Sequence, residues 1–270
     1  MRILLCTQCA SHAANTLEMG RRVVRQVGGE MDILLVDGER RAEICKIAEN
    51  TAAEIRNGGV PVRIQEQQGG VERTVLHEVH LHSYDLVIIG SRGRKGLIKM
   101  LFGSVALQVT GQTPLPVLVV KGRLRKLRKF LVCTSAGPAS ERTVAFATDL
   151  AQALGAKIHL LHVMSQLSLS GRGHTLEELE ASAEDLMDGG AREGDHLKEM
   201  LKLVQRAGVE ARALVRHGLV VDEVIAETKK GRYDLIALGA HVTPGVPPSM
   251  VNDLAGRILL AADRPVLVVH

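Results

Sequence analysis

Residues 86–104 read LVIIGSRGRKGLIKMLFGS, and they place a glycine-rich loop directly behind a buried strand. The apolar run at 86–89 is typical of a parallel strand covered on both faces, and Gly90 allows a sharp turn at its end. Gly103 and Ser104 then open an apolar helical pattern, where free backbone N–H groups and the helix dipole favour an anion. The pattern therefore predicts a phosphate-binding loop at the carboxyl end of a strand.

The chain is a tandem duplication. Tyr84-Asp-Leu-Val-Ile-Ile-Gly90 recurs as Tyr233-Asp-Leu-Ile-Ala-Leu-Gly239, at an offset of 233 − 84 = 149. Closer to the N-terminus, RILLCTQ at 2–8 matches KFLVCTS at 129–135, at an offset of 129 − 2 = 127. The offset grows by 149 − 127 = 22 along the chain, which indicates one insertion in the second copy. A repeat of this length predicts a duplicated domain rather than a solenoid unit.

The repeat sets the expected domain boundaries. We expect domains at residues 1–121 and 129–270, a linker at 122–128, and an insertion near 165–190. Each half alternates strand and helix patterns, which predicts five parallel strands with helices on both faces of the sheet. The run at 60–64 contains Pro61, so it is expected at an edge of the sheet. Ligands of such sheets bind outside the carboxyl ends of the strands, where Gly90 lies.

Composition narrows the functional class. The chain has 270 residues, 46% of them hydrophobic, and a net charge of +4. The segment Lys121–Lys129 holds six basic residues and no acidic one, so the rest has 34 − 6 = 28 basic against 30 acidic residues. This local basicity, together with only two Tyr, three Phe and no Trp, argues against nucleic-acid binding. Four cysteines in a chain of this length do not indicate a disulfide framework. No apolar run approaches the ~20 residues of a membrane span, so a cytoplasmic location is expected.

Both halves resemble universal stress protein domains, a family that binds ATP through G-x2-G-x9-G-[ST]. The motif is complete once, at Gly90, Gly93, Gly103 and Ser104. The resemblance implies two doubly wound α/β domains with five-stranded parallel sheets of strand order 3-2-1-4-5. It also implies that the last strands, near 117–120 and 266–269, pair within one chain as a pseudo-dimer. Whether the chain also forms a homodimer stays open.

The resemblance also assigns a nucleotide site in the first half. Seven residues match the phosphate and ribose side of that site: Ile89, Gly90, Arg92, Gly93, Gly103, Ser104 and Val105. Val36 matches the backbone contact to adenine, and Gln8 stands where the family has Asp. Glutamine can both donate and accept hydrogen bonds. The implied ligand is ATP, with Mg²⁺ held through the phosphates.

The second copy departs from the motif. Gly239 remains, but Val242 replaces the second glycine and Asn252-Asp253 replaces Gly-Ser, while Ser135 stands at the place of Gln8. We therefore expect one ATP site, in the first half. The resemblance implies a nucleotide-responsive regulator of the stress response, with a regulatory protein partner. No catalytic triad, nucleophile elbow, paired carboxylates or Walker lysine stands out in the sequence, so no enzyme activity is expected. The alternative is an interaction or scaffold protein of the same fold that binds no nucleotide.

Other chemistry-bearing residues have simpler explanations. Cys6 lies inside a strand and matches Cys133 of the other copy, so it is expected in the core, whereas Cys9 could sense oxidants. The segment His77-x-x-His80-x-His82 is expected on a helix surface rather than around a metal ion. Within the insertion, Thr175-Leu-Glu-Glu178 has the pattern of a capping box that opens an acidic helix.

Overall fold

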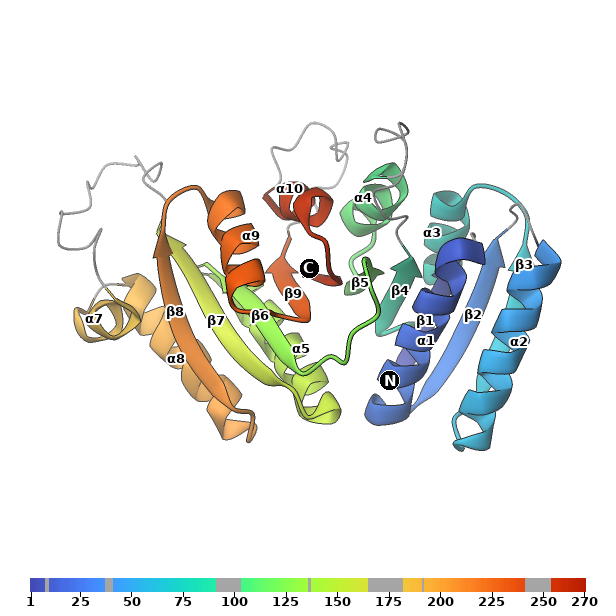
Figure 1. Ribbon diagram of the computed structural model, residues 1–270, viewed down its shortest axis with the longest axis horizontal. Helices are drawn as coiled ribbons and strands as arrows, with labels where there is room; N and C mark the ends of the chain where they lie inside the picture. The colour runs from blue at the N-terminus through green and yellow to red at the C-terminus, as the bar shows by residue number, and fades with distance from the viewer. Residues whose placement is uncertain are drawn as a thin grey trace. The chain divides into compact units, whose positions relative to one another are not determined.

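The computed structural model describes residues 1–7, 10–36, 41–90, 103–135, 137–164, 182–190, 192–240 and 254–270. These residues form two compact units. The first contains Met1–Arg125 together with Asp263–Val268. The second contains Lys126–Ala240, residues 254–262 and Val269–His270. Figure 1 shows both units as a sheet flanked by helices, and the prediction of an α/β fold with parallel sheets is confirmed.

The first unit alternates strands and helices. Its elements are β1 (Arg2–Thr7), α1 (Ala10–Val27), β2 (Glu30–Val36), α2 (Arg41–Asn57), β3 (Val62–Gln67), α3 (Val71–Leu81), β4 (Leu86–Gly90), α4 (Gly103–Gln112) and β5 (Val117–Val120). The strands lie in the order β3-β2-β1-β4-β5, and each neighbouring pair is parallel. This is the predicted order 3-2-1-4-5, and β3, which corresponds to the strand expected at 60–64, lies at the edge with Pro61 just before it. That strand begins at Val62, and the carbonyl of Pro61 accepts a hydrogen bond from the backbone N–H of Met31.

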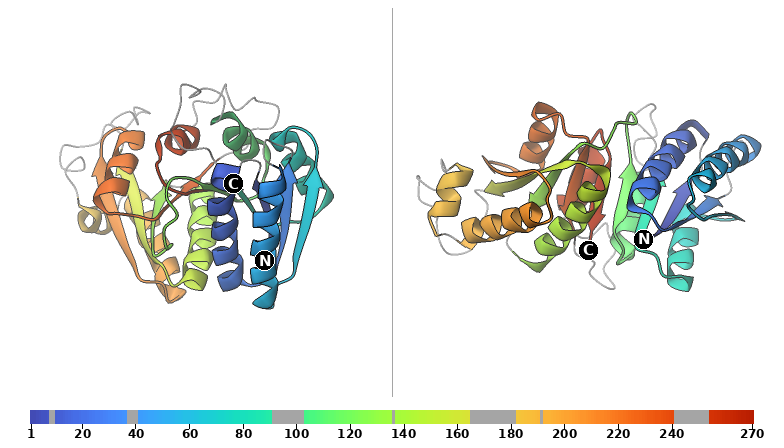
Figure 2. Two further views of the ribbon diagram at one scale, coloured as in Figure 1. Left: turned by 45° about the vertical axis from the view of Figure 1, so that its right-hand side comes forward. Right: turned by 90° about the horizontal axis from the view of Figure 1, so that it is seen from below.

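The core of the first unit lies on both faces of this sheet. Successive residues Ile3, Leu4 and Leu5 of β1 are each fully buried, which is why the strand sequences are continuous apolar runs rather than alternating ones. Helices α1 and α2 contact each other on one face, and α3 and α4 contact each other on the other face. The right panel of Figure 2 shows α1 and α2 on the side of the sheet opposite α3.

The second unit repeats the arrangement. Its elements are β6 (Lys129–Thr134), α5 (Pro138–Leu154), β7 (Lys157–Met164), α7 (Ala183–Asp188), α8 (Arg192–Arg206), β8 (Ala211–His217), α9 (Val220–Lys230), β9 (Leu235–Gly239) and α10 (Leu254–Ala261). The last strand of the chain, β10 (Val266–Val269), belongs almost entirely to the first unit. Strands β9, β6, β7 and β8 lie side by side in that order and are parallel. This is the strand order of the first unit, as the repeat predicts.

Strand β10 completes the sheet of the first unit. It pairs antiparallel with β5, with Leu267 opposite Leu118 and Val266 opposite Val119. The predicted pairing of the two last strands is therefore confirmed. As a result, the first unit contains a strand from the far end of the chain.

The insertion of the second copy is described in part. The capping-box pattern at 175–178 lies outside the described residues. A capping box is present a little further on, where the Ser182 hydroxyl accepts from the backbone N–H of Asp185, and the Asp185 carboxylate accepts from the backbone N–H of Ser182. It opens α7, which contacts α8 and β8. No helix within the described ranges combines the length and apolar character needed to cross a membrane.

Candidate functional site

The carboxyl edge of the first sheet gathers part of the predicted nucleotide site. Because the strands are parallel, their last residues meet at one edge. Cys6 lies opposite Ile89, and Gly90 opposite Val120, so β1, β4 and β5 end together. Val36 ends the neighbouring strand β2. The side chains of Val36 and Ile89 are buried, whereas Gly90 is exposed. The edge therefore presents exposed backbone at Gly90 next to the buried apolar side chains of Val36 and Ile89, which we call the apolar floor of the site.

Helix α4 brings its N-terminus toward the same edge. Gln112, its last residue, lies shortly before β5 in the chain, so this end of α4 lies near the amino end of β5. Ten helical residues rise about 15 Å, which is close to the length of the four-residue strand beside them. The first turn, which begins Gly103-Ser104-Val105, therefore points back toward the carboxyl edge. Its free backbone N–H groups and the positive end of the helix dipole can hold an anion.

The structure thus places six of the nine predicted site residues. Val36, Ile89 and Gly90 end strands at the carboxyl edge, and Gly103, Ser104 and Val105 open α4. The other three, Gln8, Arg92 and Gly93, lie outside the described residues. So do Val242, Asn252 and Asp253 of the second copy.

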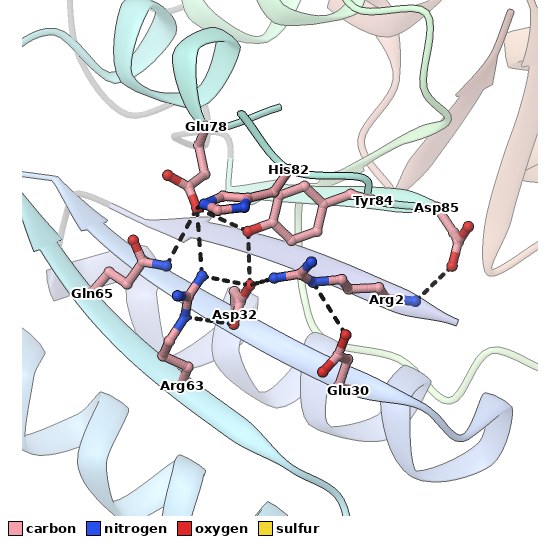
Figure 3. A network of polar contacts seen from close by, with 9 residues as sticks. All are labelled: Arg2, Glu30, Asp32, Arg63, Gln65, Glu78, His82, Tyr84 and Asp85. Atoms are coloured by element: carbon pink, nitrogen blue, oxygen red, sulfur yellow. Dashed lines mark hydrogen bonds and ion pairs between the residues drawn. The ribbon is translucent and has the colours of Figure 1, made fainter. Parts of the chain in front are cut away.

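A second polar constellation lies away from this edge and was not predicted. Figure 3 shows it near the start of the strands, centred on Asp32 of β2. The Asp32 carboxylate accepts hydrogen bonds from Tyr84 Oη at 2.8 Å, from Arg2 Nη2 at 2.9 Å and from Arg63 Nη2 at 3.1 Å. Tyr84 Oη also lies 2.9 Å from Oε1 of Glu78 on α3. We call Arg2, Asp32, Arg63, Glu78 and Tyr84 the first polar cluster.

Burial and hydrogen bonding shape the electrostatics of this cluster. The side chains of Asp32 and Glu78 are 8% and 2% exposed. Burial acts to raise the pKa of Asp32, but hydrogen bonds from Arg63, Tyr84 and Arg2 outweigh it, and the pKa lies below its ordinary value. Burial and the neighbouring carboxylates raise the pKa of Tyr84. Asp32 is therefore an anion that is fully engaged by its neighbours, which suits it to holding β1, β2, β3 and the segment before β4 together rather than to proton transfer.

The second unit contains a counterpart at every position. Following the two offsets of the repeat, Lys129, His159, Arg212, Glu227 and Tyr233 form the second polar cluster. His159 replaces the aspartate, and its Nδ1 lies 3.0 Å from Arg212 Nε and 2.7 Å from Tyr233 Oη. Burial and the cations Arg212, Lys129 and Lys157 lower the pKa of His159 to about 3. The imidazole is therefore neutral near pH 7.

One sequence signal could have revealed both clusters. The repeated Tyr-Asp pair, used above only to align the two copies, supplies the central phenol of each cluster. The aspartate of each pair caps the start of a strand. The Asp85 carboxylate accepts from the backbone N–H of Arg2 at 2.6 Å, and the Asp234 carboxylate accepts from that of Lys129 at 3.2 Å. Each pair therefore makes equivalent contacts in the two units.

The cysteines and histidines give no additional site among the described residues. Cys6 is 1% exposed, and burial raises the pKa of its thiol and that of Cys133 to about 12, so the predicted core role of Cys6 is confirmed. Cys9 lies outside the described residues. His80 Nδ1 lies 2.7 Å from the carbonyl of Leu76 on its own helix. Across the part of the chain that the structure describes, no three His, Cys, Asp or Glu side chains are grouped to hold a metal ion.

Comparison with known proteins agrees with this architecture. The model of the Universal stress protein family matches residues 7–121 and again residues 126–270. A universal stress protein of Mycolicibacterium smegmatis is 25% identical over 219 residues, which cover 78% of this chain and 70% of that protein. The crystal structure of a universal stress protein from Archaeoglobus fulgidus covers 99% of this chain and 95% of its own, with a TM-score of 0.69 and 18% identity. The crystal structure of a putative universal stress protein from Pseudomonas aeruginosa covers 99% of this chain and 92% of its own, with a TM-score of 0.73 and 17% identity.

Proposed function

This chain belongs to the universal stress protein family, and from that premise we propose that its N-terminal half binds ATP and thereby acts as a nucleotide-responsive regulator of the stress response. One observation carries the proposal. The exposed glycine that ends β4 lies at the same edge toward which the N-terminus of α4 points. The sequence between these two elements supplies the remaining members of the glycine motif.

The residues present suit such a ligand. Backbone N–H groups at Gly103, Ser104 and Val105 would hold phosphate, and Arg92 would add positive charge. Val36, at the end of β2, would provide the backbone contact to adenine. Mg²⁺ bound with ATP would neutralise part of the charge on the phosphates. The protein's own contribution is an apolar floor and fixed backbone donors.

We propose binding without turnover. Hydrolysis needs a group that orients or deprotonates a water molecule. The described strand ends at this edge are Thr7, Val36, Gln67, Gly90 and Val120, and none of these five carries a carboxylate or an imidazole. An ATP-bound form recognised by a regulatory protein partner is the simplest way for such a site to act.

Isothermal titration of the full chain with Mg-ATP tests the proposal. We expect one ATP per chain for the unchanged protein, and loss of binding in Gly103→Val, whose side chain would enter the space of the phosphates. Asn252→Val is the matched control, because residue 252 is the counterpart of residue 103 in the second copy. It should leave the affinity unchanged.

The possible outcomes separate the two candidate functions. Absence of binding to the unchanged protein would favour the scaffold that binds no nucleotide, for which Gln8 in place of Asp is the motivating observation. Equal binding by Gly103→Val would reject the assigned site. Release of labelled phosphate from ATP, abolished in Ser104→Ala, would contradict binding without turnover.

A further inference from the structure

Gly90 is in contact with a side chain of α1. A Cβ atom built on Gly90 would lie well under 3.0 Å from Oγ1 of Thr16, a separation that real Cβ atoms essentially never show. The other two nearest atoms, Cβ and Cγ2 of Thr16, would be at 3.5 and 3.7 Å, which are ordinary contact distances. Thr16 itself is 1% exposed. Among the described residues, the hydroxyl of Thr16 is therefore the single close obstacle to a side chain at position 90.

The second unit repeats this contact. Thr16 and Thr143 are related by the first offset of the repeat, and Gly90 and Gly239 by the second. A Cβ atom on Gly239 would lie 2.9 Å from Oγ1 of Thr143. That hydroxyl is held in place because it donates to the carbonyl of Ala139, at 2.7 Å. The glycine thus occurs in the half that lacks the rest of the glycine motif, which indicates that helix packing requires it there.

We infer that Thr16 is a positioning residue for the proposed nucleotide site: by packing its hydroxyl on Gly90, it fixes the end of β4 at the carboxyl edge of the sheet. The inference rests on the proposed function. The interior is close-packed, so a group added between α1 and β4 must push one of them aside. Gly90 is itself one of the residues expected to meet the nucleotide, so a shift of the strand end moves part of the proposed site.

Substitutions at positions 90 and 16, alone and combined, test this inference. Gly90→Ala should weaken Mg-ATP binding about tenfold or more by titration calorimetry, equivalent to at least one decade in Kd. Thr16→Ala removes the obstructing hydroxyl and leaves Cβ at 3.5 Å, so Gly90→Ala/Thr16→Ala should bind at least about threefold more tightly than Gly90→Ala alone. Gly90→Ala/Thr16→Val should not recover, because a methyl group replaces the hydroxyl.

Two controls separate positioning from general stability. Urea unfolding of each variant reports whether it is folded, and Gly239→Ala in the second unit should lower stability while leaving ATP affinity unchanged. If Gly90→Ala does not fold, Thr16→Ala alone decides the question, because it leaves Gly90 in place: it should weaken Mg-ATP binding, and an unchanged affinity would overturn the inference.

The results that would overturn the inference are distinct from those that would overturn the proposed function. If Gly90→Ala is less stable but binds Mg-ATP as tightly as the unchanged protein, the contact between Thr16 and Gly90 serves packing only, and the positioning role is rejected. Equal loss of affinity in both double variants would reject Thr16 as the cause. If the unchanged protein binds no ATP, the proposed function fails and the positioning role fails with it.

Discussion

Replacing Asp32 by alanine should destabilise the first unit more than any surface substitution near it. The Asp32 carboxylate is 8% exposed and accepts from Arg2, Arg63 and Tyr84, with two bonds from Arg63. A hydrogen bond to a charged group contributes about 1.5–3 kcal/mol, and breaking a buried ion pair can cost about 3–5 kcal/mol. The Arg2 and Arg63 side chains are 30% and 50% exposed and can turn toward water. We therefore expect a cost at or just below the lower end of the range for a buried pair, about 2–3 kcal/mol.

Urea unfolding of the full chain, followed by circular dichroism, measures this change. Glu30→Ala is the matched control, because Glu30 pairs with the same Arg2, at 3.2 Å, but its side chain is 54% exposed. An exposed pair contributes only about 0–1 kcal/mol. The control should therefore unfold close to the unchanged protein.

The pH dependence adds a second check. The pKa of Asp32 lies below its ordinary value in the folded protein, so its contribution is complete above that ordinary value, about 3.8. The contribution is lost as the pH falls further, through the folded pKa. The gap between the unchanged protein and Asp32→Ala should be constant near pH 7 and should narrow below about pH 4. A gap under about 0.5 kcal/mol at pH 7, the usual size of a neutral surface change, would refute the reasoning.

Three further predictions concern single residues. His159 is neutral when folded but has an ordinary pKa of 6.5 when unfolded, so its stabilising contribution is present above pH 6.5 and falls by about 2 kcal/mol by pH 5. In urea unfolding, His159→Gln should not show this decrease in the free energy of unfolding, whereas the exposed control His77→Gln should still show it. Gly29 has φ +101° and a Cβ there would run into the backbone of Met1, whereas Gly28 has φ +71° and open space around it. Thermal melts should show that Gly29→Ala lowers the free energy of unfolding by at least about 3 kcal/mol, and Gly28→Ala by only about 1 kcal/mol. Gln8→Asp should strengthen ATP binding several-fold in titration calorimetry, because a carboxylate is the stronger acceptor for the adenine amino group, and a weaker affinity would contradict the assigned adenine contact.

The sequence was most informative where one short segment decides the outcome. The run before Gly90 predicts a buried parallel strand, and β4 occupies it. The repeat predicts that Cys6 and Cys133 take the same place, and each lies in the strand that begins its copy. The strand order is predicted from the family resemblance, because no local sequence pattern shows that β1 and β4 are neighbours in the sheet.

The polar clusters could not be predicted in the same way. Arg2, Asp32, Arg63, Glu78 and Tyr84 come from five different parts of the chain, and each by itself has the pattern of a surface residue or a strand end. The register of β1, β2 and β3 brings Arg2 and Arg63 to Asp32. Glu78 on α3 and Tyr84 just before β4 join them only when α3 packs on the sheet. For the candidate site, the strand ends could be predicted but not the reason for Gly90, because Thr16 lies far earlier in the chain, on another element.

The place of β10 has a consequence for synthesis of the protein. Strand β5 ends at Val120 and its antiparallel partner begins at Val266, more than half of the chain later. At about 5–20 residues per second, a ribosome needs roughly 7–30 s to cover that distance. Throughout this interval the growing chain carries an apolar strand whose outer edge has no native partner. Such an edge is open to pairing with another chain, so the first domain is complete only once the last strand has emerged.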